Sequence, residues 1–206
     1  MASVAFFYGT LMHPKVLKLV IQNDASHLQI CSAVLLDHTR HKIKGEDYPA
    51  VVPYANGRTL FTHELTQDER CVRGTLVRGL TARDLARLDA FEDDEYTREQ
   101  LPVHPLSPFT SVQRDGEIES AGDTRVIPST PPDLPETLAE PALAHTYVWL
   151  DVSRLEAELW SYADFVKHNA WKWYRDGTEV AEEELSERRR KLLKEDRNTI
   201  LGMNRV

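Results

Sequence analysis

The order of apolar and polar residues first predicts a strand, a turn and a helix near the start of the chain. Residues 4–8 form an unbroken apolar and aromatic run, which is typical of a strand buried on both faces. Gly9 ends this run and allows another group to approach the main chain closely. Pro14 suits the first position of a helix, and apolar residues recur along one helical face as far as Ile21. We expect this helix over roughly residues 14–23.

Later stretches have the apolar spacing of strands, and they cover residues 28–36, 72–79, 96–103 and 144–150. After the first of them we expect a polar turn at residues 37–41 and a short return strand at residues 42–43. Gly74, inside the second stretch, indicates a bulge or a close approach by another backbone.

Two positions in these segments have properties of a binding site. A helix that follows a turn leaves its first N–H groups without intrahelical partners, so the turn at Gly9 can hold an anion or an oxyanion. Pro49 restricts Tyr48 to an extended conformation and so fixes the direction of its ring, which suits a pocket wall. Simple chain reversal and core packing are the alternative interpretations.

A second helix is predicted over about residues 82–91. Thr81 is a suitable N-cap residue, and Asp84 follows three positions later, as in a capping box with Asp in place of Glu or Gln. This spacing defines where the helix begins.

Glu92 is the most informative residue of this helix. It follows Leu85 and Leu88 at helical spacing, so a helix that continues to its end places Glu92 on the face that enters the core. Burial and the negative end of the helix dipole both favour the neutral form of a carboxyl, which suits an acid or base near neutral pH. The alternative is a solvent-exposed acid, as we expect for Asp89, Asp93 and Glu95.

The composition changes from residue 102 to residue 141, a stretch that contains eight of the eleven prolines. We expect a long loop or insertion without secondary structure there. A helix capped by Asp151 or Ser153 is then predicted to run through Leu155, Leu159, Tyr162 and Val166 and to end near Asn169 or Tyr174.

The expected organisation is one domain over residues 1–174, which includes the insertion. A charged C-terminal helix over residues 175–206 follows, because its charged residues pair at a spacing of four, as in an appended and largely exposed helix.

Composition narrows the class of protein. The chain has 206 residues, 41% of them hydrophobic, and a net charge of −8, which argues against nucleic acid as the main partner. Cys31 and Cys71 have no metal-type or redox-type spacing. No apolar stretch approaches the roughly 18–20 residues that span a bilayer, and no leader pattern is found. We therefore expect a cytoplasmic protein that does not bind a membrane; the sequence does not indicate its oligomeric state.

Taken together, four motifs are recognisable: Phe7-Tyr8-Gly9-Thr10-Leu11, Tyr48-Pro49-Ala50-Val51-Val52-Pro53, Val72-x-Gly74-x-Leu76 and Leu88-Asp89-x-Phe91-Glu92-x-x-x-Tyr96-x-Arg98. In this order and spacing the chain resembles the gamma-glutamylcyclotransferase-like family, in its plant and fungal avirulence-induced-gene branch. The resemblance covers about residues 4–104 and resumes at residues 147–150.

The resemblance implies an α+β fold, a small mixed β-barrel with flanking helices and one cavity. It implies an acyltransferase or lyase that lets the α-amine of a γ-glutamyl compound attack its own side-chain carbonyl, releasing 5-oxoproline and an amine. Glu92 corresponds to the general base. The substrate-binding loop corresponds to Tyr8, Gly9, Thr10, Leu11, Met12 and His13, and further walls to Tyr48, Pro49 and Tyr147. The implied partner is a small molecule, and no metal or cofactor is required.

Two other hypotheses remain open at this stage. The same cavity and Glu92 would also serve a different proton transfer on a specialised metabolite, with the insertion as a lid. Alternatively, the chain is a non-catalytic interaction module whose C-terminal helices recruit a partner. Glu92 facing solvent would favour that last hypothesis.

Overall fold

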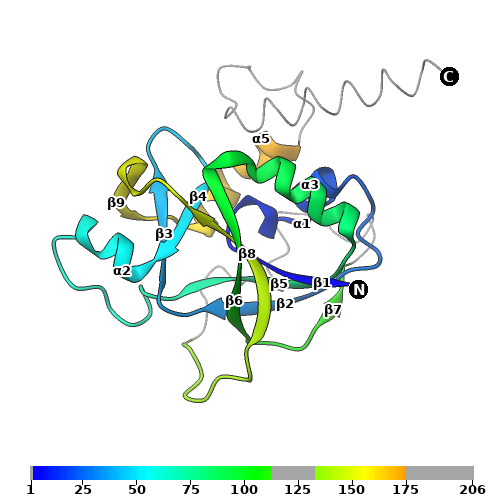
Figure 1. The fold of residues 1–206 in the computed structure, drawn as a ribbon, viewed down its shortest axis with the longest axis horizontal. Helices are drawn as coiled ribbons and strands as arrows, with labels where there is room; N and C mark the ends of the chain where they lie inside the picture. The colour runs from blue at the N-terminus through cyan, green and yellow to red at the C-terminus, as the bar shows by residue number, and fades with distance from the viewer. Residues whose placement is uncertain (1, 113–132, 175–206) are drawn as a thin grey trace.

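The computed structural model describes residues 2–112 and 133–174. In this part of the chain, five strands close into a small barrel (Figure 1). In barrel order they are β5 (Val72–Leu80), β1 (Ser3–Phe7), β8 (Ala142–Trp149), β6 (Tyr96–Pro105) and β2 (Gln29–Leu35), and β2 pairs again with β5. The β1–β8 pair is parallel and the other barrel pairs are antiparallel. The predicted mixed barrel with flanking helices is therefore confirmed.

The first strand, β1, is buried as its apolar sequence predicts. It lies between β5 and β8, and Ala5, Phe6 and Phe7 are almost inaccessible to solvent. The glycine of the neighbouring strand is needed for close packing, because a Cβ on Gly74 would lie 2.3 Å from the carbonyl oxygen of Phe7. The close backbone approach predicted at this glycine is thus confirmed.

A second, antiparallel sheet has the order β4 (Pro49–Pro53), β3 (His38–Ile43) and β9 (Leu155–Leu159) and lies to the left of the barrel in Figure 1. The helix α2 (Tyr54–Gly57) and the 3₁₀ helix η2 (Arg58–Leu60) follow β4. The predicted polar turn at residues 37–41 is wrong, because β3 already begins at His38. Two of its polar residues, Thr39 and His41, are buried with partners: the ring of His41 bonds to Thr39 Oγ1 at 2.8 Å and to the carbonyl of Glu156 at 3.0 Å.

The helix predicted through Leu155, Leu159, Tyr162 and Val166 is wrong in its first part, because residues 155–159 form a strand. Its second part is confirmed, since residues 162–168 and 170–174 are helical. A spacing of four residues between Leu155 and Leu159 fits a strand as well as a helix, and here both leucines pair with β3. Asp151 caps only the short 3₁₀ helix η4 (Val152–Arg154).

The helices that follow β9 begin after a different cap. The side chain of Ser161 accepts a hydrogen bond from the N–H of Asp164 and starts α4 (Tyr162–His168). A shorter helix, α5 (Ala170–Tyr174), completes the described chain.

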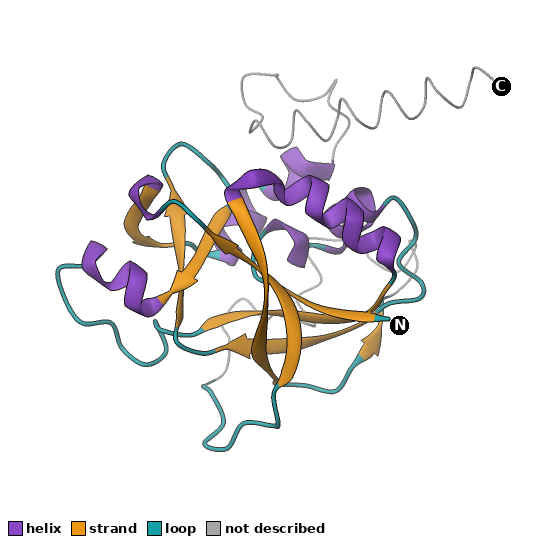
Figure 2. Ribbon diagram, in the orientation of Figure 1, coloured by secondary structure: helices purple, strands orange, loops and turns teal. Residues whose placement is uncertain are grey.

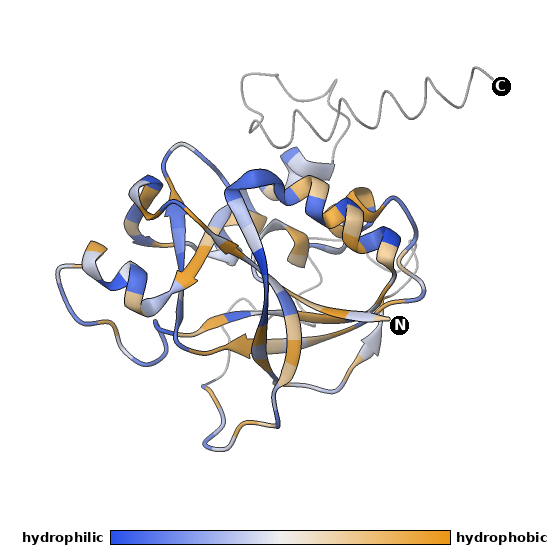
Figure 3. Cartoon of the chain, in the orientation of Figure 1, coloured by the Kyte–Doolittle hydropathy of each residue, from blue (hydrophilic) through white to orange (hydrophobic). Residues whose placement is uncertain are grey.

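Two longer helices cover the barrel, α1 (Pro14–Ile21) and α3 (Ala82–Glu92) (Figure 2). The predicted capping box is present at the start of α3, where Thr81 and Asp84 exchange hydrogen bonds. Hydrophilic and hydrophobic residues alternate along α3, as expected for a helix with one buried face (Figure 3). The 3₁₀ helices η1 (Thr10–Met12) and η3 (Asp93–Glu95) adjoin α1 and α3.

Strand structure continues into the segment expected to have none. β6 extends to Pro105, and a short strand β7 (Thr110–Ser111) pairs with β2. The predicted charged helix over residues 175–206 lies outside the described residues. Of the described helices, none is long and apolar enough to cross a membrane.

Candidate active site

A cavity of about 320 Å³, counted with its open mouth, lies where the end of β1 meets the end of α3. Its walls are mostly apolar or aromatic, and Glu92 is the one carboxylic acid among them. The lining residues are Phe6, Phe7, Tyr8, Gly9, Thr10, Leu11, Tyr48, Pro49, Glu92, Tyr96 and Tyr147.

Glu92 is the last residue of α3 and is only 8% exposed. The buried side chains of Leu88 and Phe91 fix the last turn of this helix against the core. Asp93 then adopts a φ of 57°, a left-handed value that favours glycine, so the chain leaves the helix abruptly. The predicted placement of the Glu92 carboxyl on the buried face is confirmed.

The turn after β1 forms the opposite side of the cavity. It enters η1, where the N–H of Met12 donates to the carbonyl of Gly9 at 3.0 Å. A Cβ on Gly9 would lie 2.8 Å from Cγ of Pro49, so glycine lets the turn contact the neighbouring wall. Gly9 has a φ of −126°, so the close approach rather than a left-handed backbone accounts for this residue.

Arg40 supports this turn from beneath. Its guanidinium donates to the carbonyl of Tyr8 at 2.8 Å and to the carbonyl of Arg73 at 3.1 Å, and it lies over the ring of Trp160. Burial lowers the pKa of Arg40 to about 10, which leaves it charged at neutral pH. The side chain therefore ties the turn at Tyr8 to β3 and β5.

Tyr48 and Pro49 form a wall that is held by hydrogen bonds. The hydroxyl of Tyr96 donates to the carbonyl of Pro49 at 2.8 Å, and the hydroxyl of Tyr48 donates to Glu95 Oε2 at 3.3 Å. Behind this wall, the buried ring of Trp173 on α5 packs edge-on against Tyr48, with ring centroids 6.4 Å apart. The wall is thus rigid on both sides.

Tyr147, on β8, links the two halves of the site. The hydroxyl of Tyr8 donates to the carbonyl of Tyr147, and the hydroxyl of Tyr147 donates to Asp89 Oδ1 at 2.8 Å. Burial raises the pKa of the Tyr147 phenol well above its usual value, and the hydrogen bond to Asp89 and the charges of Asp89 and Glu92 raise it further. The phenol is therefore neutral and lies within the electrostatic influence of Glu92.

Most of the residues predicted from the sequence line the cavity, but Met12 and His13 do not. His13 instead caps α1 by accepting from the N–H of Lys15 at 3.3 Å, and its ring stacks on Tyr174. Burial, followed by the charge of Lys15, lowers the pKa of His13 to about 4, so its ring is neutral at neutral pH.

Sequence reasoning missed three lining residues, Phe6, Phe7 and Tyr96. A signal existed for each, since the two phenylalanines directly precede the predicted turn and Tyr96 belongs to the motif that contains Glu92. No local signal pointed to Arg40, whose partners are distant in the sequence.

The arrangement suits proton transfer to or from a small molecule. A buried carboxylate among aromatic rings can accept a proton from a bound substrate, and the surrounding hydroxyls and backbone groups can orient that substrate. Within residues 2–112 and 133–174, no group of three or more His, Cys, Asp or Glu side chains is placed to hold a metal ion.

In the described part of the chain, a small closed barrel with Glu92 in a mostly apolar and aromatic cavity defines the class of fold and site. The sequence profile described as Gamma-glutamyl cyclotransferase, AIG2-like, matches residues 5–117, more than half of the chain. The protein belongs to this family, as its motifs predicted. The matched region includes the turn at Tyr8 and the base candidate Glu92, whereas Tyr147 lies beyond it.

Two Arabidopsis thaliana proteins are similar in sequence over 98 residues. AIG2-like protein C is 33% identical, and the alignment covers 48% of this chain and 48% of that protein. AIG2-like protein D is 36% identical, with coverage of 48% and 54%. The chain thus spans about half the length of these curated relatives.

Solved structures with similarity include the solution structure of an Arabidopsis thaliana protein, with a TM-score of 0.47, 19% identity and coverage of 91% of this chain and 92% of that chain. A structure described as a gamma-glutamyl cyclotransferase has a TM-score of 0.45, 12% identity and coverage of 95% and 99%. A yeast gamma-glutamyl cyclotransferase specific to glutathione has a TM-score of 0.43, 12% identity and coverage of 94% of both chains.

Proposed function

We propose that this protein cyclises a γ-glutamyl compound to 5-oxoproline and a free amine, with Glu92 as the general base. The observation that carries the proposal is the burial of the Glu92 carboxyl in the same cavity as the turn from Tyr8 to Leu11. A base and a set of backbone donors then face the same bound molecule. The family assignment supports this reading, because the matched region contains both.

The chemistry requires a base because the α-amine of a γ-glutamyl compound is protonated and inert at neutral pH. Glu92 accepts one proton from this ammonium, and the amine nitrogen then attacks the γ-carbonyl carbon and closes a five-membered ring. Breaking the bond to the leaving amine requires a proton on that nitrogen, which Glu92 returns. The ring nitrogen still carries two protons after the attack, and it gives up one of them, which the departing amine takes up as it leaves as an ammonium ion. General-base help of this kind contributes about 10²–10⁴-fold to a rate.

Positioning contributes the remainder, because the reaction is intramolecular. The substrate chain must fold back so that its amine meets its own carbonyl. Reacting groups that are held in this geometry react much faster than groups that move freely. The hydrogen-bonded wall at Tyr48 and Pro49 and the ring of Tyr147 would hold that bent conformation. Backbone N–H groups at Gly9 and Thr10 would face the oxyanion or the substrate carboxylate.

The burial of Glu92 also bears on the competing hypotheses. Exposure of Glu92 to solvent would have favoured the non-catalytic interaction module, but its side chain lies inside the cavity. Proton transfer on a different metabolite would use the same cavity, so only the substrate distinguishes it from the proposed reaction.

The test is release of 5-oxoproline from γ-glutamyl amino acids, glutathione and γ-glutamyl amines by the intact protein and by Glu92→Gln. We expect release by the intact protein and a loss of at least about 10²-fold in the variant, because an amide cannot accept the proton. Glu99→Gln is the matched control, since Glu99 is exposed on β6 and does not line the cavity.

Unfolding temperatures of the three proteins verify that the variants fold. Release that persists in Glu92→Gln would remove Glu92 as the base. Absence of release from every substrate with the intact protein would overturn cyclotransfer of γ-glutamyl compounds.

A further inference from the structure

A second carboxylate, Asp89, reaches the site from the helical turn that precedes Glu92. Its Oδ1 accepts a hydrogen bond of 2.8 Å from the hydroxyl of Tyr147, and its Oδ2 lies 3.3 Å from a guanidinium nitrogen of Arg98. The position of Asp89 on the helix had indicated an acid facing solvent. Its side chain is 44% exposed, yet both of its oxygen atoms contact residues of the barrel.

The barrel determines where these partners lie. Arg98 on β6 and Tyr147 on β8 are directly opposite each other in an antiparallel pair, so their side chains share one face of the sheet. Asp89 approaches that face from α3. The three side chains therefore form a chain of contacts, from Arg98 through Asp89 to Tyr147, that ends at the cavity wall.

Counting donors and acceptors shows what this contact does. A tyrosine hydroxyl has one proton and two lone pairs, whereas a carboxylate only accepts hydrogen bonds. Tyr147 therefore commits its single proton to Asp89 and retains lone pairs for other donors. The hydroxyl of Tyr8 donates its own proton to the main-chain carbonyl of Tyr147.

Tyr147 and Glu92 would face the same bound molecule, because they share one cavity. Both residues line the same cavity of about 320 Å³. With its proton turned toward Asp89, the phenol presents an acceptor beside a carboxylate. Two adjacent acceptors match a group that has several N–H donors and a positive charge.

We propose that Asp89 is a positioning residue that makes Tyr147 Oη an acceptor and thereby builds, with Glu92, a binding site for the α-ammonium group of the substrate. This inference rests on the proposed function and specifies one part of its site. Glu92 takes one proton of the ammonium, and Tyr147 Oη accepts a second N–H and holds the resulting amine toward the carbonyl. Arg98 occupies the other oxygen of Asp89 and keeps that carboxylate in place.

The test uses two inert ligands that differ only in the amine. The first is a γ-glutamyl compound in which methylene groups replace both the scissile carbonyl and the amide nitrogen, so that no second amine is created, and the second is the same compound without the α-amine. Calorimetry gives the affinity of each ligand for the intact protein and for Asp89→Asn, Tyr147→Phe and Asp94→Asn. Asp94 is the matched control, because it is an exposed acid near Glu92 that does not line the cavity.

We expect Tyr147→Phe and Asp89→Asn to weaken binding of the aminated ligand about 10-fold and to leave the other ligand unchanged, since one charge-assisted hydrogen bond is lost or misdirected. The double variant Asp89→Asn/Tyr147→Phe should bind the aminated ligand as weakly as Tyr147→Phe alone, because both substitutions act through Tyr147 Oη. Asp94→Asn should behave as the intact protein.

Three outcomes would contradict these expectations in distinguishable ways. An equal loss for both ligands would make Asp89 a merely structural residue, and unchanged binding of the aminated ligand would remove the ammonium site. Either result leaves the proposed cyclisation intact. Failure of the intact protein to bind either ligand would overturn the proposed function itself. Tyr147→Phe keeps the buried aromatic ring and removes only the hydroxyl. It therefore tests the ammonium site even if Asp89→Asn does not fold.

Discussion

The contact between Gly9 and Pro49 shows how one missing carbon atom shapes the cavity. A Cβ at Gly9 would lie 2.8 Å from Cγ and 2.9 Å from Cδ of Pro49, and a proline ring has little freedom to move away. The turn and the wall can therefore meet only when residue 9 is glycine.

Gly9→Ala should separate these two surfaces and so reduce turnover more than stability. We expect a fall in kcat/KM of at least about 10-fold, because shifts of about an ångström in a positioned site are costly. The expected loss of stability is about 1–3 kcal/mol, as for other overpacked sites. Release of 5-oxoproline and chemical unfolding measure the two effects. Unchanged kcat/KM would show that the cavity does not depend on this contact.

At the scale of single residues, the sequence predicted Glu92 well and Asp89 poorly. The face of Glu92 follows from its spacing to Leu88, which a helix turns into a shared direction. The role of Asp89 depends on Tyr147, which lies 58 residues later. Helical periodicity distinguishes a polar face from an apolar one but does not identify what a polar side chain meets.

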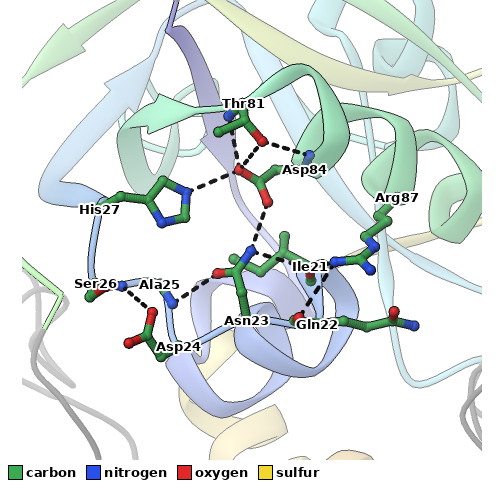
Figure 4. A network of polar contacts seen from close by, with 10 residues as sticks. All are labelled: Ile21, Gln22, Asn23, Asp24, Ala25, Ser26, His27, Thr81, Asp84 and Arg87. Atoms are coloured by element: carbon green, nitrogen blue, oxygen red, sulfur yellow. Dashed lines mark hydrogen bonds and ion pairs between the residues drawn. The ribbon is translucent and has the colours of Figure 1, made fainter. Parts of the chain in front are cut away.

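Among the elements, α3 carries the base candidate at one end and a network of polar contacts at the other (Figure 4). Asp84 Oδ2 accepts from Thr81 and lies 3.0 Å from the ring of His27, while Oδ1 accepts from the amide of Asn23 at 2.8 Å. These contacts join the start of α3 to the loop between α1 and β2. The network therefore fixes the direction in which α3 points Glu92.

Asp84→Asn should destabilise the protein by about 1–3 kcal/mol, because an amide has one acceptor oxygen and its NH₂ group would face another donor. Asp24→Asn is the control, since Asp24 is exposed and its side chain accepts from the loop N–H of Ser26 (Figure 4). Urea unfolding of both variants measures the difference. Equal stability of Asp84→Asn and the intact protein would show that the network does not hold the helix.

The Asp84 carboxylate should also account for part of the loss of protein stability at acid pH. Burial raises the pKa of Asp84, but hydrogen bonds from Thr81, His27 and Asn23 outweigh burial, so the net pKa lies below its usual value. A lowered folded-state pKa means that Asp84 stabilises the protein above about pH 4 and that this contribution is lost as the pH falls further. The urea stability of Asp84→Asn should therefore fall less steeply in acid than that of the intact protein.

At the scale of the whole molecule, α5 completes the site although it lies beyond the region matched by the family profile. Trp173 is fully buried and packs against Tyr48, Phe91 and Phe165, with ring centroids 6.0–6.4 Å apart. Phe91 directly precedes Glu92. The end of the described chain thus supports both the wall and the helix that carries the base candidate.

Trp173→Ala should cost about 3–5 kcal/mol of stability, as other large-to-small changes of buried aromatic residues do. It should also raise KM, because Tyr48 loses the ring behind it. Trp171→Ala, on the same helix but only half-buried, should cost much less. Unfolding curves and substrate titrations provide both comparisons. If Trp173→Ala and Trp171→Ala changed stability and KM equally, Trp173 would have no special role in supporting the site.

Local spacing alone determined the buried strand β1, the cap and direction of α3, and the inward position of Glu92, since each depends on residues within a few positions of one another. Tertiary structure decided that Leu155–Leu159 pairs with β3, that Arg40 lies beneath the turn at Tyr8, and that Tyr147 bonds to Asp89. A spacing of four fits both a strand and a helix, and a polar side chain has the same local pattern whether it meets water or a distant partner. Barrel closure removes that ambiguity, because it brings strands far apart in sequence into one register and so determines which partner each side chain meets.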